Sequence, residues 1–287
     1  MSRRKLLVIH NPTAGRRRRK LKRVLDALSR ADVAVELAPT AYAGHAIELT
    51  RDCNGFDAVI AAGGDGTINE VANGIDGRPL GLIPLGTANV LAIELGYPTH
   101  ADALAQLLAG GPIRQVRPGR IAGRRFVQMA SAGFDARVVA RLDLGLKRRL
   151  GKAAYALTGG RELLYGDRAA VRLRLDGADH TVGQVVVAKG RYYGGAFLVA
   201  PAARLASPDF QVCLFPNPRP MAIAGYAAAI AVGQAAAWTD MRIVTARELW
   251  LDSPSGDPVQ VDGDALGRLP ALITVDAEPL QLISPNA

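Results

Sequence analysis

The residues with the clearest chemical potential form the run Gly63-Gly64-Asp65-Gly66-Thr67-Ile68-Asn69. An apolar run at 57–62 precedes it and apolar residues at helical spacing follow, so we expect a buried strand to end at Gly63 and a helix to begin near Thr67. Backbone N–H groups at a helix start suit a phosphate, and glycine lets the chain approach it closely. Asp65 would repel that phosphate unless Mg²⁺ bridged the two. The alternative is a capping Asp with glycines that only form a turn.

Small polar residues follow other short apolar strands in the same half of the chain. They are Asn11 after residues 5–10, Thr40 after 33–37, and Gly86, Thr87 and Asn89 after 80–84. Alternating strands and helices build a parallel sheet whose carboxyl ends share one edge, and such sheets bind ligands there. We therefore expect these polar groups to lie together. Thr40 has two readings, as a donor to a phosphate or as a helix cap.

A second group of carboxylates lies late in the chain, in Val261-Asp-Gly-Asp264. An Asp-Gly pair after a strand is most often a plain hairpin turn. The carboxylate of Asp264 could instead take a proton from an attacking hydroxyl, if the fold brought it to the glycine-rich loop. The spacing of the residues leaves both readings open.

The composition is that of a globular protein with a basic surface. Hydrophobic residues make up 49% of the 287 residues, and 35 Lys and Arg against 26 Asp and Glu give a formal charge of +9, which favours anionic partners. Two separated cysteines and no signal-peptide pattern predict a cytoplasmic protein. The run Arg16-Arg-Arg-Arg-Lys20 is either a solvated helix start or a contact for anionic lipid or nucleic acid. Residues 221–238 are too rich in alanine for a membrane span and predict a buried helix.

The periodicity predicts two domains. Strands and helices alternate to about residue 121, which predicts an open α/β nucleotide-binding domain over 1–121. Short strands then dominate, with helices at 144–164 and 221–238, which predicts a β-rich sandwich domain over 122–287. The last strand has two possible assignments, to this second domain or back to the first.

Together these motifs resemble the diacylglycerol kinase catalytic-domain family. The resemblance rests on five runs in the order expected, and it is closest to the soluble bacterial lipid kinases, which are related to sphingosine and ceramide kinases. The runs are Asn11-Pro-Thr-Ala-Gly15, Gly63-Gly-Asp-Gly-Thr-Ile-Asn-Glu-Val-Ala-Asn-Gly74, Pro84-Leu-Gly-Thr-Ala-Asn89, Ser131-Ala-Gly-Phe-Asp135 and Asp262-Gly-Asp264. NAD kinases and phosphofructokinases are more remote relatives that share Gly-Gly-Asp-Gly.

The resemblance implies ATP and Mg²⁺ as cofactors and assigns the site residues. ATP would meet Asn11, Thr40, Gly63, Gly64, Asp65, Gly66, Thr67, Ile68, Asn69, Gly86 and Thr87. Asp65 would bind the catalytic Mg²⁺. The family's proton acceptor falls on Asp264, with Asp262 as the second candidate because relatives usually carry Glu at the position of Asp264.

Two departures from the family pattern concern metal ions. Val90 follows Asn89 where soluble bacterial members often have Asp, which removes one carboxylate. Ser207-Pro-Asp-Phe-Gln211 replaces an Asp-Gly turn that holds a structural Mg²⁺ in relatives. The resemblance leaves Asp209 as a side-chain ligand for this ion, with backbone carbonyls of Ala206 and Gln211.

These observations predict an ATP-dependent kinase that phosphorylates a lipid hydroxyl, with diacylglycerol as the first substrate to test. A sphingoid base, ceramide, phosphatidylglycerol or NAD are alternative substrates. A nucleotide-binding regulator without catalysis is the alternative of another class. Nucleic acid is not an expected partner because aromatic residues make up only 5% of the chain. Contact with the inner face of the membrane through Arg16 to Lys20, and an oligomeric state, are further expectations.

Overall fold

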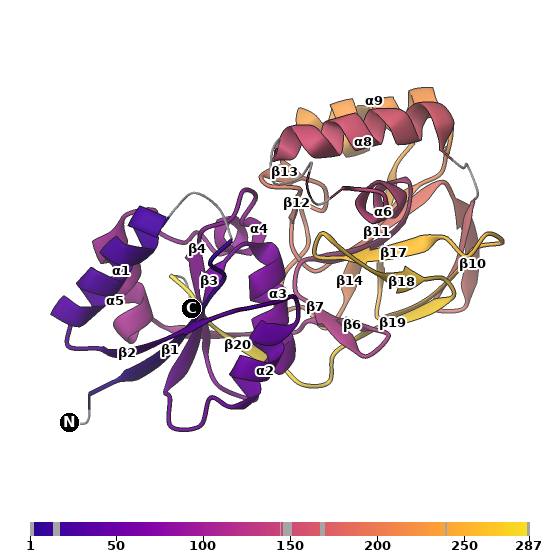
Figure 1. The fold of residues 1–287 in the computed structure, drawn as a ribbon. Helices are drawn as coiled ribbons and strands as arrows, with labels where there is room; N and C mark the ends of the chain where they lie inside the picture. Colours follow the sequence, from indigo (N-terminus) through magenta and orange to yellow (C-terminus); the bar gives the residue numbers. More distant parts are fainter. Residues whose placement is uncertain are drawn as a thin grey trace. The chain divides into compact units, whose positions relative to one another are not determined.

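The computed structural model describes residues 3–13, 18–143, 145, 151–166, 170–238 and 240–285. Within these residues the chain forms two compact units. The first contains Met1–Arg117 and Ala277–Ala287, and the second contains Pro118–Asp276. Each unit has its own sheets and core, in agreement with the fold class expected from the sequence (Figure 1).

The first unit contains one six-stranded sheet in the order β2-β1-β3-β4-β20-β5. The strands are β1 (Lys5–His10), β2 (Ala34–Pro39), β3 (Ala58–Gly63), β4 (Leu80–Pro84), β5 (Ile113–Val116) and β20 (Leu280–Ile283). Neighbouring strands are parallel except for β5, which runs antiparallel to β20. β3 and β4 are buried along their whole length, as continuous apolar runs predict for the centre of a parallel sheet.

Helices cover both faces of this sheet. They are α1 (Arg18–Arg30), α2 (His45–Arg51), α3 (Asp65–Gly74), α4 (Val90–Glu94) and α5 (Ala101–Gly110). Figure 1 shows α1 with α5 on one face and α2 with α3 on the other. α1 buries Leu21, Val24 and Leu28, whose spacing places them on one side of the helix. α3 begins two residues before the predicted start at Thr67.

The register of the parallel strands aligns their carboxyl ends. His10 at the end of β1 lies opposite Pro39 of β2 and Ala62 of β3, and Gly63 lies opposite Pro84 of β4. The loops that follow these strands therefore begin at one edge of the sheet, where open α/β sheets bind ligands.

The second unit is an antiparallel sandwich of two six-stranded sheets, ordered β10-β9-β16-β19-β6-β7 and β15-β14-β11-β8-β17-β18. The strands are β6 (Gly119–Ile121), β7 (Arg124–Phe126), β8 (Met129–Gly133), β9 (Val171–Leu175), β10 (Ala178–Val182), β11 (Gln184–Ala188), β14 (Phe210–Phe215), β15 (Arg242–Ala246), β16 (Glu248–Asp252), β17 (Pro258–Val261), β18 (Asp264–Arg268) and β19 (Ala271–Val275). A separate hairpin pairs β12 (Tyr192–Tyr193) with β13 (Phe197–Leu198). Alternate residues of β9 are buried, which places every second side chain in the core between the sheets.

The helices of the second unit are α6 (Phe134–Ala140), α8 (Lys152–Tyr165), α9 (Pro220–Ala231) and α10 (Ala235–Trp238). Of the helix expected at 144–164, residues 144 and 146–150 lie outside the described residues. α8 and α9 lie side by side as an outer layer of this unit (Figure 1). None of the helices in the described part of the chain has the length and apolar character needed to span a bilayer.

The prediction of a buried helix over 221–238 was wrong. The segment forms two helices, and within α9 only Tyr226 and Ala229 are buried. An apolar sequence indicates burial only when a second layer covers it, and the described residues of this unit place α9 at the surface.

The N-terminal segment of the first unit ends at Arg117, four residues earlier than the predicted domain end at residue 121. β6 begins at Gly119 and pairs with β19, which assigns this short strand to the sandwich. β20 joins the sheet of the first unit between β4 and β5. The hydroxyl of Tyr97 donates to the carbonyl of Ile283 and fastens this last strand.

A buried ion-pair cluster holds α6 against its neighbours. The guanidinium of Arg137 donates to Glu162 of α8 at 2.9 Å and to Asp257 at 3.0 Å, and all three side chains are almost fully buried. Arg141, whose side chain is exposed, also pairs with Glu162. Because charges in a protein interior need partners, the cluster depends on Arg137, the cation that Glu162 and Asp257 share.

We expect Arg137→Met to lower the free energy of unfolding by about 3–5 kcal/mol, because it leaves the buried Asp257 without this cation and Glu162 with the exposed Arg141. Urea denaturation of the full chain measures the loss. The matched control is Arg174→Met, which breaks an exposed pair with Asp179 and should leave the midpoint unchanged. Equal shifts for the two variants would contradict this account of the cluster.

Candidate nucleotide and acceptor sites

Two loops of the first unit touch backbone to backbone at the shared strand edge. A Cβ atom on Gly86 would lie 2.5 Å from the Cα of Gly64, and one on Gly63 would lie 2.4 Å from the Thr67 hydroxyl oxygen. Gly64 has an ordinary φ of −92°. These glycines are therefore required for close approach rather than for a left-handed backbone.

Asp65 connects the same two loops through its carboxylate. Its two oxygens accept the backbone N–H groups of Asn89 at 2.9 Å and Val90 at 2.7 Å, at the start of α4. Asn89 has a left-handed φ of 51° and donates its side-chain amide to the carbonyl of Gly86. Asp65 thus caps α4, whereas the alternative interpretation of the sequence had it cap its own helix. A carboxylate has about four acceptor sites, so these two bonds alone do not exhaust it.

The first turn of α3 offers backbone groups rather than side chains. Thr67, Ile68 and Asn69 are buried. The N–H of Ile68 already donates to the carbonyl of Gly64, and Asn69 accepts from Asn73. A phosphate at the start of α3 would therefore use backbone N–H groups of the residues before Ile68 in the run Gly63 to Asn69.

Asn11 and Thr40 lie at the ends of β1 and β2, on the same edge. The Oδ1 of Asn11 accepts the N–H and the hydroxyl of Thr13, which leaves the Nδ2 amino group as its donor to a ligand. Thr40 does not cap α2, because that helix begins at His45 and Glu70 of α3 accepts N–H groups at its start. Gly15, Arg16 and Arg17 lie outside the described residues.

A cavity of about 390 Å³ opens beside Asn11. Arg18 was named within the basic run as a contact for anionic lipid or nucleic acid, but neither Arg18 nor Lys22 was placed beside Asn11 from the sequence. Arg18 and Lys22 of α1 line the cavity together with His10, Asn11, Asp26 and Leu85. Lys20 donates to the carbonyl of Pro84 at 3.3 Å. The basic run was the available signal, because its continuation into α1 places cations one turn apart.

The surroundings of His10 disfavour the charged form of its imidazole. Burial lowers the pKa of its imidazole, and the charge of Arg18 lowers it further against a backbone hydrogen bond to Ala38 that raises it. Among the described lining residues, Arg18 and Lys22 set two cations against one acid, Asp26, so the cavity favours an anion.

In the second unit, the Asp262 carboxylate is bound by backbone. It accepts the N–H groups of Val127, Gln128 and Met129 at 2.8–2.9 Å. Asp262 and Gly263 both have positive φ, at 47° and 91°, which is the two-residue turn that best joins twisted strands. Asp262 therefore holds the β17–β18 turn against the chain between β7 and β8.

Asp264 begins β18 and has a different environment. Its side chain is 42% exposed and lies 4.0 Å from the guanidinium of Arg124. The turn beside it is fastened by Gln260, which accepts the N–H of Gly263 at 2.8 Å. Of Asp262 and Asp264, Asp264 is thus the solvent-accessible carboxylate, and the turn beside it is held by the Gln260 side chain.

Gln260 also connects this turn to a partly buried carboxylate at Asp135. Its side-chain amide donates to Asp135 at 3.1 Å, and the hydroxyls of Ser131 and Tyr193 donate to the same group. Burial raises the pKa of Asp135, while these hydrogen bonds oppose the shift. Asp135 belongs to a run that the sequence reading singled out, but nothing in the sequence pairs it with Gln260 or Tyr193.

The side chains around the predicted structural metal site bond to one another, and the backbone carbonyls of Ala206 and Gln211 stay a prediction. The hydroxyl of Ser207 donates to the Asp209 carboxylate, and the side chain of Gln211 donates to Thr245 at 3.0 Å. Ala206 is exposed. Among the described residues, no three His, Cys, Asp or Glu side chains gather as a metal site.

Comparisons with known proteins cover both units. Residues 5–121 match the diacylglycerol kinase catalytic domain, and residues 128–284 match the YegS C-terminal NAD kinase beta sandwich-like domain. A probable YegS-like lipid kinase of Pseudomonas aeruginosa (strain UCBPP-PA14) is 30% identical over 91% of this chain and 87% of its own length. A diacylglycerol kinase of Bacillus subtilis is 38% identical, but the alignment spans only about half of each protein, 53% of both.

A solved structure has the same fold. The crystal structure of a putative diacylglycerol kinase from Bacillus anthracis aligns with a TM-score of 0.82 over 98% of this chain and 95% of its own, at 23% identity. The matched domains, in this order and over nearly the whole chain, show that it belongs to the family of diacylglycerol kinases and YegS-like lipid kinases.

Proposed function

We propose that this protein transfers the γ-phosphoryl group of ATP to a lipid hydroxyl, with diacylglycerol as the first substrate. The observation that carries the proposal is the aligned strand edge, where Gly64 and Gly86 bring two loops together beside a helix start. Phosphoryl transfer requires mainly positioning and neutralisation of charge, and this edge offers N–H donors, a carboxylate and nearby cations.

ATP would use the groups at this edge of the first unit. The N–H groups at the start of α3 and the Nδ2 of Asn11 suit phosphate oxygens, and Arg18 and Lys22 line the adjacent cavity. Thr40, Gly63, Gly66, Thr67 and Thr87 complete the proposed set from the same loops. Asp65 would hold Mg²⁺ with the phosphates, because Mg²⁺ usually takes one or two carboxylates and completes its shell with phosphate and water. Mg²⁺ would neutralise charge on the transferred group.

Asp264 is the better candidate for the proton acceptor. A general base must reach the proton of the attacking hydroxyl, and Asp264 is exposed on a fixed turn. Asp262 already accepts three backbone N–H groups, so we assign it a positioning role.

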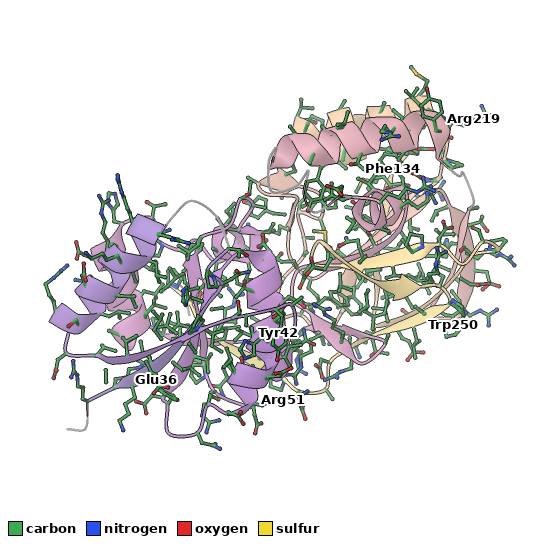
Figure 2. The ribbon with its side chains drawn as sticks, viewed as in Figure 1. Glu36, Tyr42, Arg51, Phe134, Arg219 and Trp250 are labelled. Carbon is green, nitrogen blue, oxygen red and sulfur yellow. The ribbon has the colours of Figure 1, made fainter. Side chains whose placement is uncertain are left out.

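Contact with the membrane is a further part of this proposal, since a lipid substrate lies in a bilayer. α9 contains no charged residue and exposes Met221, and α8 beside it exposes Leu157, Leu164 and Tyr165. The one acid of the two helices, Glu162, is buried. Figure 2 shows Arg219 at one end of this α8–α9 layer. An apolar surface with cations and no exposed acid suits an anionic bilayer.

The direct test of the function is a transfer assay with radiolabelled ATP and Mg²⁺. Diacylglycerol, sphingosine, ceramide and phosphatidylglycerol are offered in mixed micelles, and NAD in solution. We expect label in phosphatidic acid. Label in another lipid would change the substrate assignment, label in NAD would refute lipid transfer, and ATP binding without transfer to any acceptor would favour a regulator.

We expect Asp264→Asn to reduce kcat by roughly two to four orders of magnitude, because the amide cannot take the proton. ATP affinity and thermal stability should remain near the parent values, since the side chain is exposed. Asp264→Glu, the residue usual in relatives, should retain substantial activity. Parent turnover by Asp264→Asn would refute the assignment.

The matched comparison is Asp262→Asn, whose main effect should be on stability. An amide cannot accept at both positions, so one of three backbone N–H groups loses its acceptor, at a cost of about 1–3 kcal/mol. Chemical denaturation measures this loss. A parent-like stability with a rate as low as that of Asp264→Asn would move the proton acceptor two residues back.

For Asp65→Asn we expect two effects together. The amide nitrogen would face one of two backbone N–H groups, so the free energy of unfolding should fall by about 1–3 kcal/mol. Loss of the charge should also abolish most Mg²⁺-dependent turnover, as measured at saturating ATP. Normal stability with near-normal turnover would contradict both roles.

Membrane contact is tested by sedimentation with phosphatidylglycerol vesicles at low salt. Leu157→Glu places a charge on the α8–α9 layer and should weaken binding, whereas Leu272→Glu, at a similarly exposed site on β19, should not. Replacing Arg16 to Arg19 with Ser tests the basic run, where each cation near an anionic surface contributes about 1 kcal/mol. Equal binding by all variants would exclude both surfaces.

A further inference from the structure

Lys189 carries a charge into the interior of the second unit. It follows β11 directly and is only 1% exposed, among the largest fully buried side chains of the described residues. A buried ammonium is costly unless its charge and donors are satisfied, so this residue requires a structural reason.

The ammonium of Lys189 is held by backbone carbonyls of the turn before β14. Its Nζ donates to the carbonyl of Ser207 at 2.5 Å and to that of Asp209 at 3.1 Å. It also lies 5.4 Å from the ring centroid of Phe210, within range of a cation–π contact. Ser207 closes the turn by donating its N–H to Arg204 at 2.9 Å.

This arrangement disagrees with the structural Mg²⁺ implied by the family resemblance. A metal there would use the same turn, through Asp209 and backbone carbonyls. The turn already holds one cation, because the ammonium of Lys189 binds the carbonyls of Ser207 and Asp209, next to the positions where the carbonyls of Ala206 and Gln211 would bind a metal. The residues present therefore do not fit a second cation beside Lys189, because Asp209 is the one acid of residues 204–211 and would have to offset both the ammonium and a divalent ion.

We propose that the Lys189 ammonium is a built-in cation that replaces a structural divalent metal in the second unit. Lysine suits this role because its ammonium is a compact point charge with three donors. The sandwich then folds independently of divalent cations. If the proposed kinase activity holds, Mg²⁺ is needed for phosphoryl transfer alone.

The first test is thermal unfolding of the full chain without nucleotide, in EDTA and in millimolar MgCl₂. We expect the two midpoints to agree within about 1 °C, since no structural ion is lost to the chelator. Chelated protein should also regain full activity without delay when Mg²⁺ is restored. A parent midpoint that falls by several degrees in EDTA would overturn the proposal, and it would do so whether or not the protein is a kinase.

The second test removes the charge. Lys189→Met keeps the apolar stem, and we expect its midpoint to fall by about 5 °C or more in both buffers. Lys5→Met, which removes an exposed ammonium from the first unit, is the control and should unfold with the parent. Lys189→Gln retains a donor without the charge and serves if the Met variant does not fold. Parent-like unfolding of either Lys189 variant would show that no cation is required there.

Discussion

The candidate ATP site lies at the edge of the first sheet where the parallel strands end, and it depends on the hydrogen bonds that the Asp65 carboxylate accepts. This carboxylate lies in the glycine-rich loop after β3 and accepts two N–H groups from the loop after β4, so one side chain fixes two loops that come from different strands. These hydrogen bonds hold the two loops so close that a Cβ atom on Gly86 would clash with the Cα of Gly64. α4 has five residues, too few to be stable alone, and its start is supported by this cap.

Other carboxylates on α3 and in the Asp262–Gly263 turn also accept backbone N–H groups from neighbouring segments. Asp65 and Glu70 each accept N–H groups at the start of a neighbouring helix, and Asp262 accepts three from the chain between β7 and β8. Such acids organise backbone, because a charged acceptor forms the stronger hydrogen bonds. Asp264 differs in its exposure, which is why chemistry is proposed for it and positioning for its neighbour.

Much of this organisation could be predicted from the sequence, because it depends on local pattern. Continuous apolar runs indicated the central strands, and polar residues after them indicated the shared edge. The target of the Asp65 carboxylate could not be predicted, since Asn89 and Val90 are 24 and 25 residues away. The burial of Lys189 and the exposure of α9 depend equally on tertiary packing, and both run against the usual preferences of their residue types.

The central claim is that Asp65 holds the two loops together before any ligand binds. Amide hydrogen exchange at Asn89 and Val90 in the nucleotide-free protein tests it most directly, because these N–H groups are at the start of a helix and have no partner within it. The account predicts slow exchange of both amides, well below the rate of unstructured peptide. Exchange at the unprotected rate in the folded protein would contradict it.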